Sequence, residues 1–114
     1  MIRYQSDMEK GFEAEPAGGS GRMTFDTLLK PAETGGRTGM VAAVTLEPHS
    51  TVGEHKHTED SELYYVLSGS VVMIEDGKEY PMAAGDAEFC PAGHSHGLEN
   101  PTDEPIRFLA VTLK

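Results

Sequence analysis

Residues 55–62 read HKHTEDSE, which places two histidines and a carboxylate within one short stretch. Side chains two positions apart on a β-strand point to the same face, so His55 and His57 would present their imidazoles side by side. Glu62 follows a short polar run that can bend the chain back toward them. Imidazole and carboxylate together suit a divalent cation such as Mn, Fe, Ni, Zn or Co. These three ligands do not complete a site, so a further histidine is needed from elsewhere in the chain.

Short strand-like segments surround this stretch. Apolar and β-branched runs alternate with turns rich in Gly and Pro, and no long segment has the apolar spacing of a helix. Asp76-Gly77 is a strong signal for a two-residue hairpin. Such a pattern indicates an all-β fold, here a small antiparallel barrel. The expected strands are 23–29, 41–46, 63–67, 71–75, 78–82, 87–90, 95–99 and 106–113.

The length of the chain limits it to one domain. Its 114 residues can form a single core but not two. Residues 1–22 are weakly patterned, and residues 13–21 combine Gly and Pro in a way that breaks both regular structures. We therefore expect an N-terminal arm at 1–22, which a dimer could exchange between its protomers, and a single barrel at 23–114.

The charge balance excludes several classes of partner. Nine basic against nineteen acidic residues give a formal charge of −10, which repels nucleic acid and anionic lipid. The sequence has no apolar run long enough for a spanning helix and no apolar stretch of the secretory kind near residue 1. A single cysteine, Cys90, excludes an internal disulfide framework. We expect a cytoplasmic protein that binds neither nucleic acid nor membranes.

A second segment, GDAEFCPAGHSHGLEN at 85–100, contains two more histidines among turn residues. Gly85 permits a positive-φ turn, and Pro91-Ala92-Gly93 forces another tight one. His96 then lies at the start of a new strand, where it could face the first cluster. His94 follows the turn directly, and we expect it at the rim of the site or exposed.

Together the two segments resemble the paired motifs of the cupin superfamily. The first motif is His-x-His, four residues, Glu, six residues and Gly, and it is met at His55, His57, Glu62 and Gly69. The second is Gly, five residues, Pro-x-Gly, two residues, His, three residues and Asn, and it is met at Gly85, Pro91, Gly93, His96 and Asn100. Within the superfamily the chain looks most like small single-domain bacterial cupins of the Cupin_2 type, loosely described as oxalate-decarboxylase-like.

One position departs from the family pattern. Cupins often have Gly shortly before the first motif, and this chain has His49 there. Histidine adopts a left-handed backbone more readily than most residues, so the fold is not in question. The role of this extra imidazole is left open.

The resemblance implies a double-sheet jelly roll with one divalent transition metal per chain. It also implies the metal ligands, which would be His55, His57, Glu62 and His96. A His-x-His pair alone would indicate surface histidines on a polar loop, but the carboxylate at matching spacing and the second motif favour metal binding.

The strand periodicity suggests which side chains surround the metal. Tyr64 and Val66 share a face with Glu62, so we expect them in the cavity wall or just behind it, together with Met73 and Phe89. If Phe89 faces inward, Cys90 faces away, and we interpret Cys90 as a buried small apolar side chain rather than a reactive thiol. On the last strand, either Phe108 and Ala110 or their neighbours face the cavity.

Four protein ligands leave open positions on a metal that prefers five or six, and such positions distinguish a catalytic metal from a structural one. We expect an enzyme acting on a small organic acid, enol or sugar-like metabolite, by dioxygenase, decarboxylase or isomerase chemistry. The alternative is a metal-dependent binding or sensing module without catalysis, and no catalytic residue can be named. A homodimer is expected, because sheet edges need cover and the outer face of Leu63, Tyr65 and Leu67 is apolar.

Overall fold

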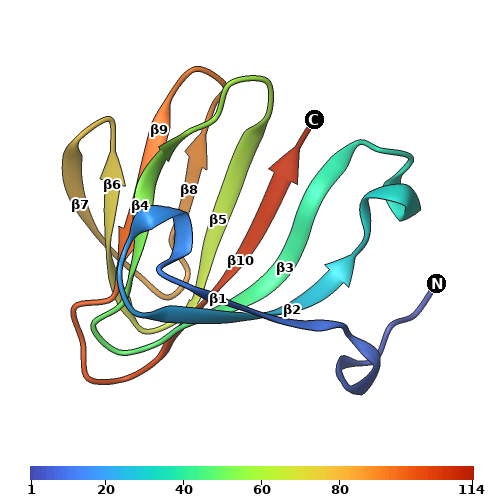
Figure 1. The fold of residues 1–114 in the computed structure, drawn as a ribbon, viewed down its shortest axis with the longest axis horizontal. Helices are drawn as coiled ribbons and strands as arrows, with labels where there is room; N and C mark the ends of the chain where they lie inside the picture. The colour runs from blue at the N-terminus through green and yellow to red at the C-terminus, as the bar shows by residue number, and fades with distance from the viewer.

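The computed structural model describes all residues 1–114, which form two facing antiparallel sheets (Figure 1). The six-stranded sheet has the order β1 (Lys10–Ala14), β2 (Arg22–Leu29), β3 (Thr38–Leu46), β10 (Ile106–Leu113), β5 (Ser61–Ser68) and β8 (Ala87–Cys90). The four-stranded sheet has the order β4 (Thr51–Lys56), β9 (Ser95–Glu99), β6 (Ser70–Glu75) and β7 (Lys78–Ala83). Three short 3-10 helices are present: η1 (Gln5–Asp7) precedes β1, η2 (Pro16–Gly18) connects β1 to β2, and η3 (Pro31–Thr34) connects β2 to β3. The predicted all-β jelly-roll architecture is confirmed.

The core fills the space between the two sheets. Along β10 every second residue is buried, so Phe108 and Ala110 face inward while Arg107 and Leu109 face out, which settles the register that the sequence left open. Full burial of one large apolar side chain contributes about 1.5–3 kcal/mol. The core residues are Met23, Ala42, Val44, Leu46, Val52, Tyr64, Val66, Val71, Met73, Leu98, Ile106, Phe108 and Ala110.

Strand β8 has its faces opposite to the prediction. Phe89 is 49% exposed, whereas Glu88 and Cys90 are buried. Residues directly opposite each other in an antiparallel pair share a face, and β8 pairs with β5 so that Cys90 lies opposite Glu62 and Phe89 opposite Leu63. Phe89 therefore lies on the outer face, and the prediction that it lines the interior is wrong.

Strand β1 was not expected from the sequence. Strand β1 lies in the weakly patterned arm and pairs with β2 of the same chain. Its Gly11 is required by this pairing, because a Cβ there would come within 2.2 Å of the Phe25 ring. After β1, the chain crosses to the other sheet and lies against β4 (Figure 1). Exchange of this arm between protomers stays a prediction.

Asn100 fixes the end of β9 against the opposite sheet. Its side chain is fully buried, and its amide nitrogen donates to the carbonyl oxygens of Leu46, Glu47 and Glu104. Its Oδ1 accepts from the backbone N–H and hydroxyl of Thr102. Buried polar groups are stable only when paired in this way. None of the helices has the length and hydrophobicity needed to cross a membrane.

Candidate metal centre

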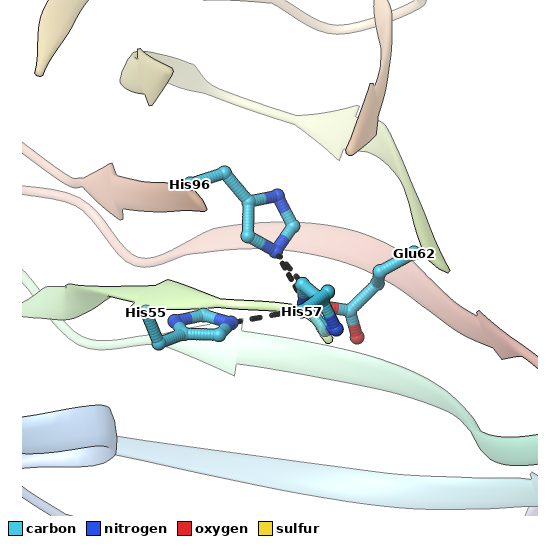
Figure 2. A group of neighbouring side chains, drawn as sticks. All are labelled: His55, His57, Glu62 and His96. Carbon is cyan, nitrogen blue, oxygen red and sulfur yellow. Dashed lines mark hydrogen bonds and ion pairs between the residues drawn. The ribbon is translucent and has the colours of Figure 1, made fainter. Parts of the chain in front are cut away.

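Four side chains converge between the two sheets (Figure 2). The ligand atoms of His55, His57, Glu62 and His96 all lie within 4.8 Å of one another. His55 lies on β4, His57 directly after it, Glu62 on β5 and His96 on β9. Glu62 Oε1 is 3.1 Å from His57 Nε2, 3.0 Å from His96 Nε2 and 3.8 Å from His55 Nε2. The four residues that the sequence singled out as ligands are thus brought together in space.

A β-bulge turns His55 into the interior. Val52 lies opposite Leu98 and His55 opposite His96, so residues 53–54 of β4 face a single residue of β9. Val52 is buried, and strict alternation from it would point His55 outward. One extra residue reverses the alternation, which is how bulges re-aim side chains next to sites. Spacing within the first motif gave no sign of this bulge.

Each imidazole is held through its other nitrogen. In His55, the Nδ1 atom lies 2.8 Å from the carbonyl oxygen of Gly53. The corresponding partner is Asp60 Oδ1 at 2.9 Å for His57 and Glu88 Oε1 at 2.9 Å for His96. These partners accept hydrogen bonds, so Nδ1 carries a proton in all three rings. Nε2 points to the centre, where it donates to Glu62 when protonated and offers a lone pair to a metal when it is not. Such partners orient metal-bound histidines and fix their tautomer.

Glu62 is held as a carboxylate. Burial raises the pKa of Glu62, but hydrogen bonds from His55 and His96 outweigh burial and keep that pKa well below its ordinary value. The hydroxyl of Thr112 donates to its second oxygen at 3.2 Å. The carboxylate is therefore both charged and oriented.

The cluster attracts positive charge. Burial lowers the pKa of His96, yet its hydrogen bonds to Glu62 and Glu88 raise it to about 9. The pKa of His55 is raised chiefly by Glu62. The Nε2 atoms of His57 and His96 lie only 3.0 Å apart, so a proton or a metal ion must lie between their lone pairs. A divalent metal can take the place of that proton, so the residues fit a metal with nitrogen and oxygen ligands.

A cavity of about 220 Å³ opens beside the cluster. Tyr64 belongs to its wall, as predicted, and stacks on the His96 ring with centroids 4.5 Å apart. Val66 and Met73 also face inward, but they belong to the packed core and not to the wall. The wall consists of Glu13, Pro16, Ala17, Met23, Met40, Val52, His55, His57, Glu62 and Tyr64.

Sequence reasoning missed two parts of the site. The arm contributes Glu13, Pro16 and Ala17 to the wall, and the sequence contains no signal for this because the contact is made across the fold. Glu88, which holds His96, was missed because β8 was assigned the wrong inner face. Glu88 is only 6% exposed, because the register that buries Cys90 also turns Glu88 inward.

The remaining histidines and the cysteine lie outside the ligand set. His94 is exposed, as predicted, and pairs with Asp76 at 2.8 Å. His49 has the left-handed backbone that its position demands, with φ of 56°, and its ring contacts Asp103. Burial, with help from Glu88, raises the pKa of the Cys90 thiol to about 11, so Cys90 is a protonated, buried side chain.

Comparisons with known proteins agree with this architecture. Residues 42–112 match the model of the cupin domain. The chain is 38% identical to an oxalate-binding protein of Thermotoga maritima, over 99% of this chain and 93% of that protein. It matches a crystal structure of a predicted oxalate decarboxylase from Thermotoga maritima with a TM-score of 0.94 and 34% identity, over 99% and 98% of the two chains. A sugar phosphate isomerase from Silicibacter pomeroyi matches with a TM-score of 0.79 and 28% identity, over 100% and 76% of the chains. Because the cupin domain model matches more than half of this chain, the chain belongs to the cupin family.

Proposed function

We propose that this chain is a metal-dependent enzyme that acts on a small organic acid, enol or sugar-like metabolite. The observation that carries the proposal is the convergence of three Nε2 atoms and one carboxylate on a point in the wall of a cavity. A divalent metal held there would supply a Lewis acid or, as Fe or Mn, a redox partner for dioxygenase, decarboxylase or isomerase chemistry. Mn, Fe, Ni, Zn and Co all suit this ligand set.

The cavity supports a small ligand. Its volume of about 220 Å³ lies below the range of roughly 300–1,000 Å³ that is typical of pockets for drug-sized molecules. Met23, Met40 and Val52 make one side of it apolar, which limits water around a bound molecule. The relatives named for oxalate binding and oxalate decarboxylation support a small carboxylic acid as the ligand class.

A second candidate function is metal-dependent binding without catalysis. Apart from the four candidate ligands, the wall has only Glu13 and Tyr64 as ionisable side chains. Burial raises the pKa of Tyr64 far above its ordinary value, so its hydroxyl stays protonated. The cavity is therefore poor in groups for acid–base chemistry, and the relative named as an oxalate-binding protein supports this candidate.

One experiment separates the two candidates. The protein is loaded with Mn, Fe(II), Co, Ni or Zn, and bound metal is counted by elemental analysis. Calorimetry then measures binding of small carboxylic acids, while an oxygen electrode and NMR follow their turnover. Metal-dependent turnover supports the enzyme, and metal-dependent binding without turnover supports the binding module. A chain that holds no metal and no acid would rule out both.

We also propose that the chain forms a homodimer through the outer face of the six-stranded sheet. Tyr65, Leu67 and Phe89 are exposed there by 40%, 43% and 49% of their surface. An apolar surface of this kind marks an interaction site. Light scattering of the purified protein measures the oligomeric state, and a monomeric mass at high concentration would contradict the proposal.

A further inference from the structure

The arm places one unpaired carboxylate at the cavity. Glu13 of β1 lies directly opposite Met23 of β2, and residues opposite each other in an antiparallel pair share a face. Met23 is buried and lines the cavity, and Glu13 belongs to the same wall. The Glu13 carboxylate takes part in none of the hydrogen bonds or ion pairs of the chain. It is therefore free to contact whatever enters.

The backbone that follows Glu13 is held by close packing of the arm. Pro16 is buried, and the following segment lies against β4 at backbone contact, since a Cβ on Gly53 would come within 2.2 Å of the Ala17 carbonyl oxygen. The Glu15 N–H donates to the Gly21 carbonyl oxygen at 2.9 Å, and the arm is thereby closed back on itself. Glu13 itself is exposed, so its carboxylate stands at the open side of the cavity, where an entering ligand meets it.

The charges of the wall define which ligands fit. Glu13 and Glu62 are its only charged side chains apart from the histidines, and it contains no Lys or Arg. The Glu62 carboxylate offsets one of the two charges of a divalent metal, which leaves one positive charge for the ligand. A ligand with a single carboxylate balances that charge. A dianionic diacid brings one more negative charge than the metal still carries, and Glu13 in the wall would repel that excess charge.

We infer that Glu13 is a specificity-determining residue, which selects small acids or enols bearing a hydroxyl group against dianionic diacids. A carboxylate accepts a hydrogen bond from a hydroxyl and repels a second carboxylate, so both effects act in the same direction. This inference rests on the proposed function, because it requires that a small acid binds in the metal-loaded cavity. Within the small acids of the proposed function, it favours hydroxy acids, enols and sugar-like molecules over oxalate.

The test compares two probes that differ in one group. Glycolate and oxalate share a carboxylate, and the second carboxylate of oxalate replaces the hydroxymethyl group of glycolate. Calorimetry measures both dissociation constants with the Zn-loaded protein, for the wild type, Glu13→Gln and Glu13→Lys. Each variant is accepted for comparison when its metal content equals that of the wild type.

We expect Glu13→Gln to tighten oxalate relative to glycolate by roughly threefold, because Glu13 is exposed and solvent screens its contact with the ligand. Glu13→Lys should shift the ratio further in the same direction. The matched control is Glu15→Gln, which removes the same charge two residues along the arm and outside the cavity wall. For Glu15→Gln, the ratio of the oxalate and glycolate dissociation constants should equal that of the wild type.

Two results overturn the role of Glu13 alone. One is a wild type that binds both acids while Glu13→Gln and Glu13→Lys leave the ratio unchanged. The other is an equal shift in Glu15→Gln, which would indicate a general effect of net charge. If the metal-loaded wild type binds neither acid and no other small metabolite, the proposed function itself fails, and the inference fails with it.

Discussion

His55 and His96 lie directly opposite each other on β4 and β9, with their ring centroids 4.8 Å apart. Both therefore sit on regular strands and not on loops. Their positions follow from the sheet's own hydrogen bonds, and the bulge that aims His55 also supplies the Gly53 carbonyl oxygen that holds its Nδ1. Sites built on strands in this way are held more exactly than sites on loops. The fold itself therefore holds His55 and His96 in place.

The first prediction concerns the ligands themselves. His57→Ala and Glu62→Gln each remove one donor from a four-ligand set, so bound metal should fall well below one ion per chain. Elemental analysis of the purified protein measures this. The control is His94→Ala, because His94 is exposed and pairs with Asp76 outside the cluster. Unchanged metal content in both ligand variants would contradict the assignment.

The second prediction concerns the carboxylate behind His96. Glu88→Gln keeps the size of the side chain but removes the charge that holds His96 Nδ1. Loss of such a partner typically weakens metal binding by about 10- to 100-fold. Competition with a chelator measures the affinity, and Glu79→Gln on the exposed face of β7 is the control. Equal affinities for the two variants would show that Glu88 has no part in holding the metal.

The sequence identified the four clustered side chains because the information for them is local. The spacing from His55 to Glu62 and the turn before His96 are both contained in short stretches, and most strands have apolar alternation of their own. What could not be predicted depends on partners far along the chain. The register of β8 with β5 decides which face of β8 points inward. The close backbone contact between Gly53 and Ala17 decides where the arm lies.

The third prediction tests the close backbone contact between Gly53 and Ala17. Gly53→Ala would place a Cβ 2.2 Å from the Ala17 carbonyl oxygen and 2.9 Å from the Gly19 nitrogen, both of which are backbone atoms. The arm must therefore shift, and overpacking of this kind typically costs about 1–3 kcal/mol. Denaturant unfolding measures the loss of stability, and amide hydrogen exchange should rise at residues 17–19.

Gly39→Ala is the matched control for this change. A Cβ at Gly39 would meet the flexible end of Lys114 first, at 3.3 Å, and no backbone atom is among its near neighbours. Its stability should stay close to that of the wild type. If Gly53→Ala were equally stable and its arm equally protected, the close packing of the arm on β4 would be refuted.

The fourth prediction is a pH dependence at the N-terminal end. Arg3 donates to both oxygens of Glu33 at 2.8 and 2.5 Å, and the Lys30 backbone N–H donates to the first of them at 2.7 Å. The Arg3 hydrogen bonds, followed by that of Lys30, lower the pKa of Glu33 from 4.5 to about 2. A carboxylate whose pKa is lowered by folding stabilises the folded state above its unfolded pKa. That stabilisation is lost as the pH falls toward the folded pKa.

Glu33→Gln should therefore lower the Tm of the metal-free protein at pH 7, and the difference from wild type should shrink between pH 4.5 and about 2. Glutamine keeps an oxygen that can accept from Lys30, so the variant isolates the charge. Glu79→Gln, in the exposed part of β7, controls for the loss of one negative charge. Because Arg3 and Glu33 lie at the surface, salt should also reduce the difference. If the Tm difference stayed constant from pH 7 to pH 2, the pKa of Glu33 would be the same in the folded and unfolded chains, and the prediction would be wrong.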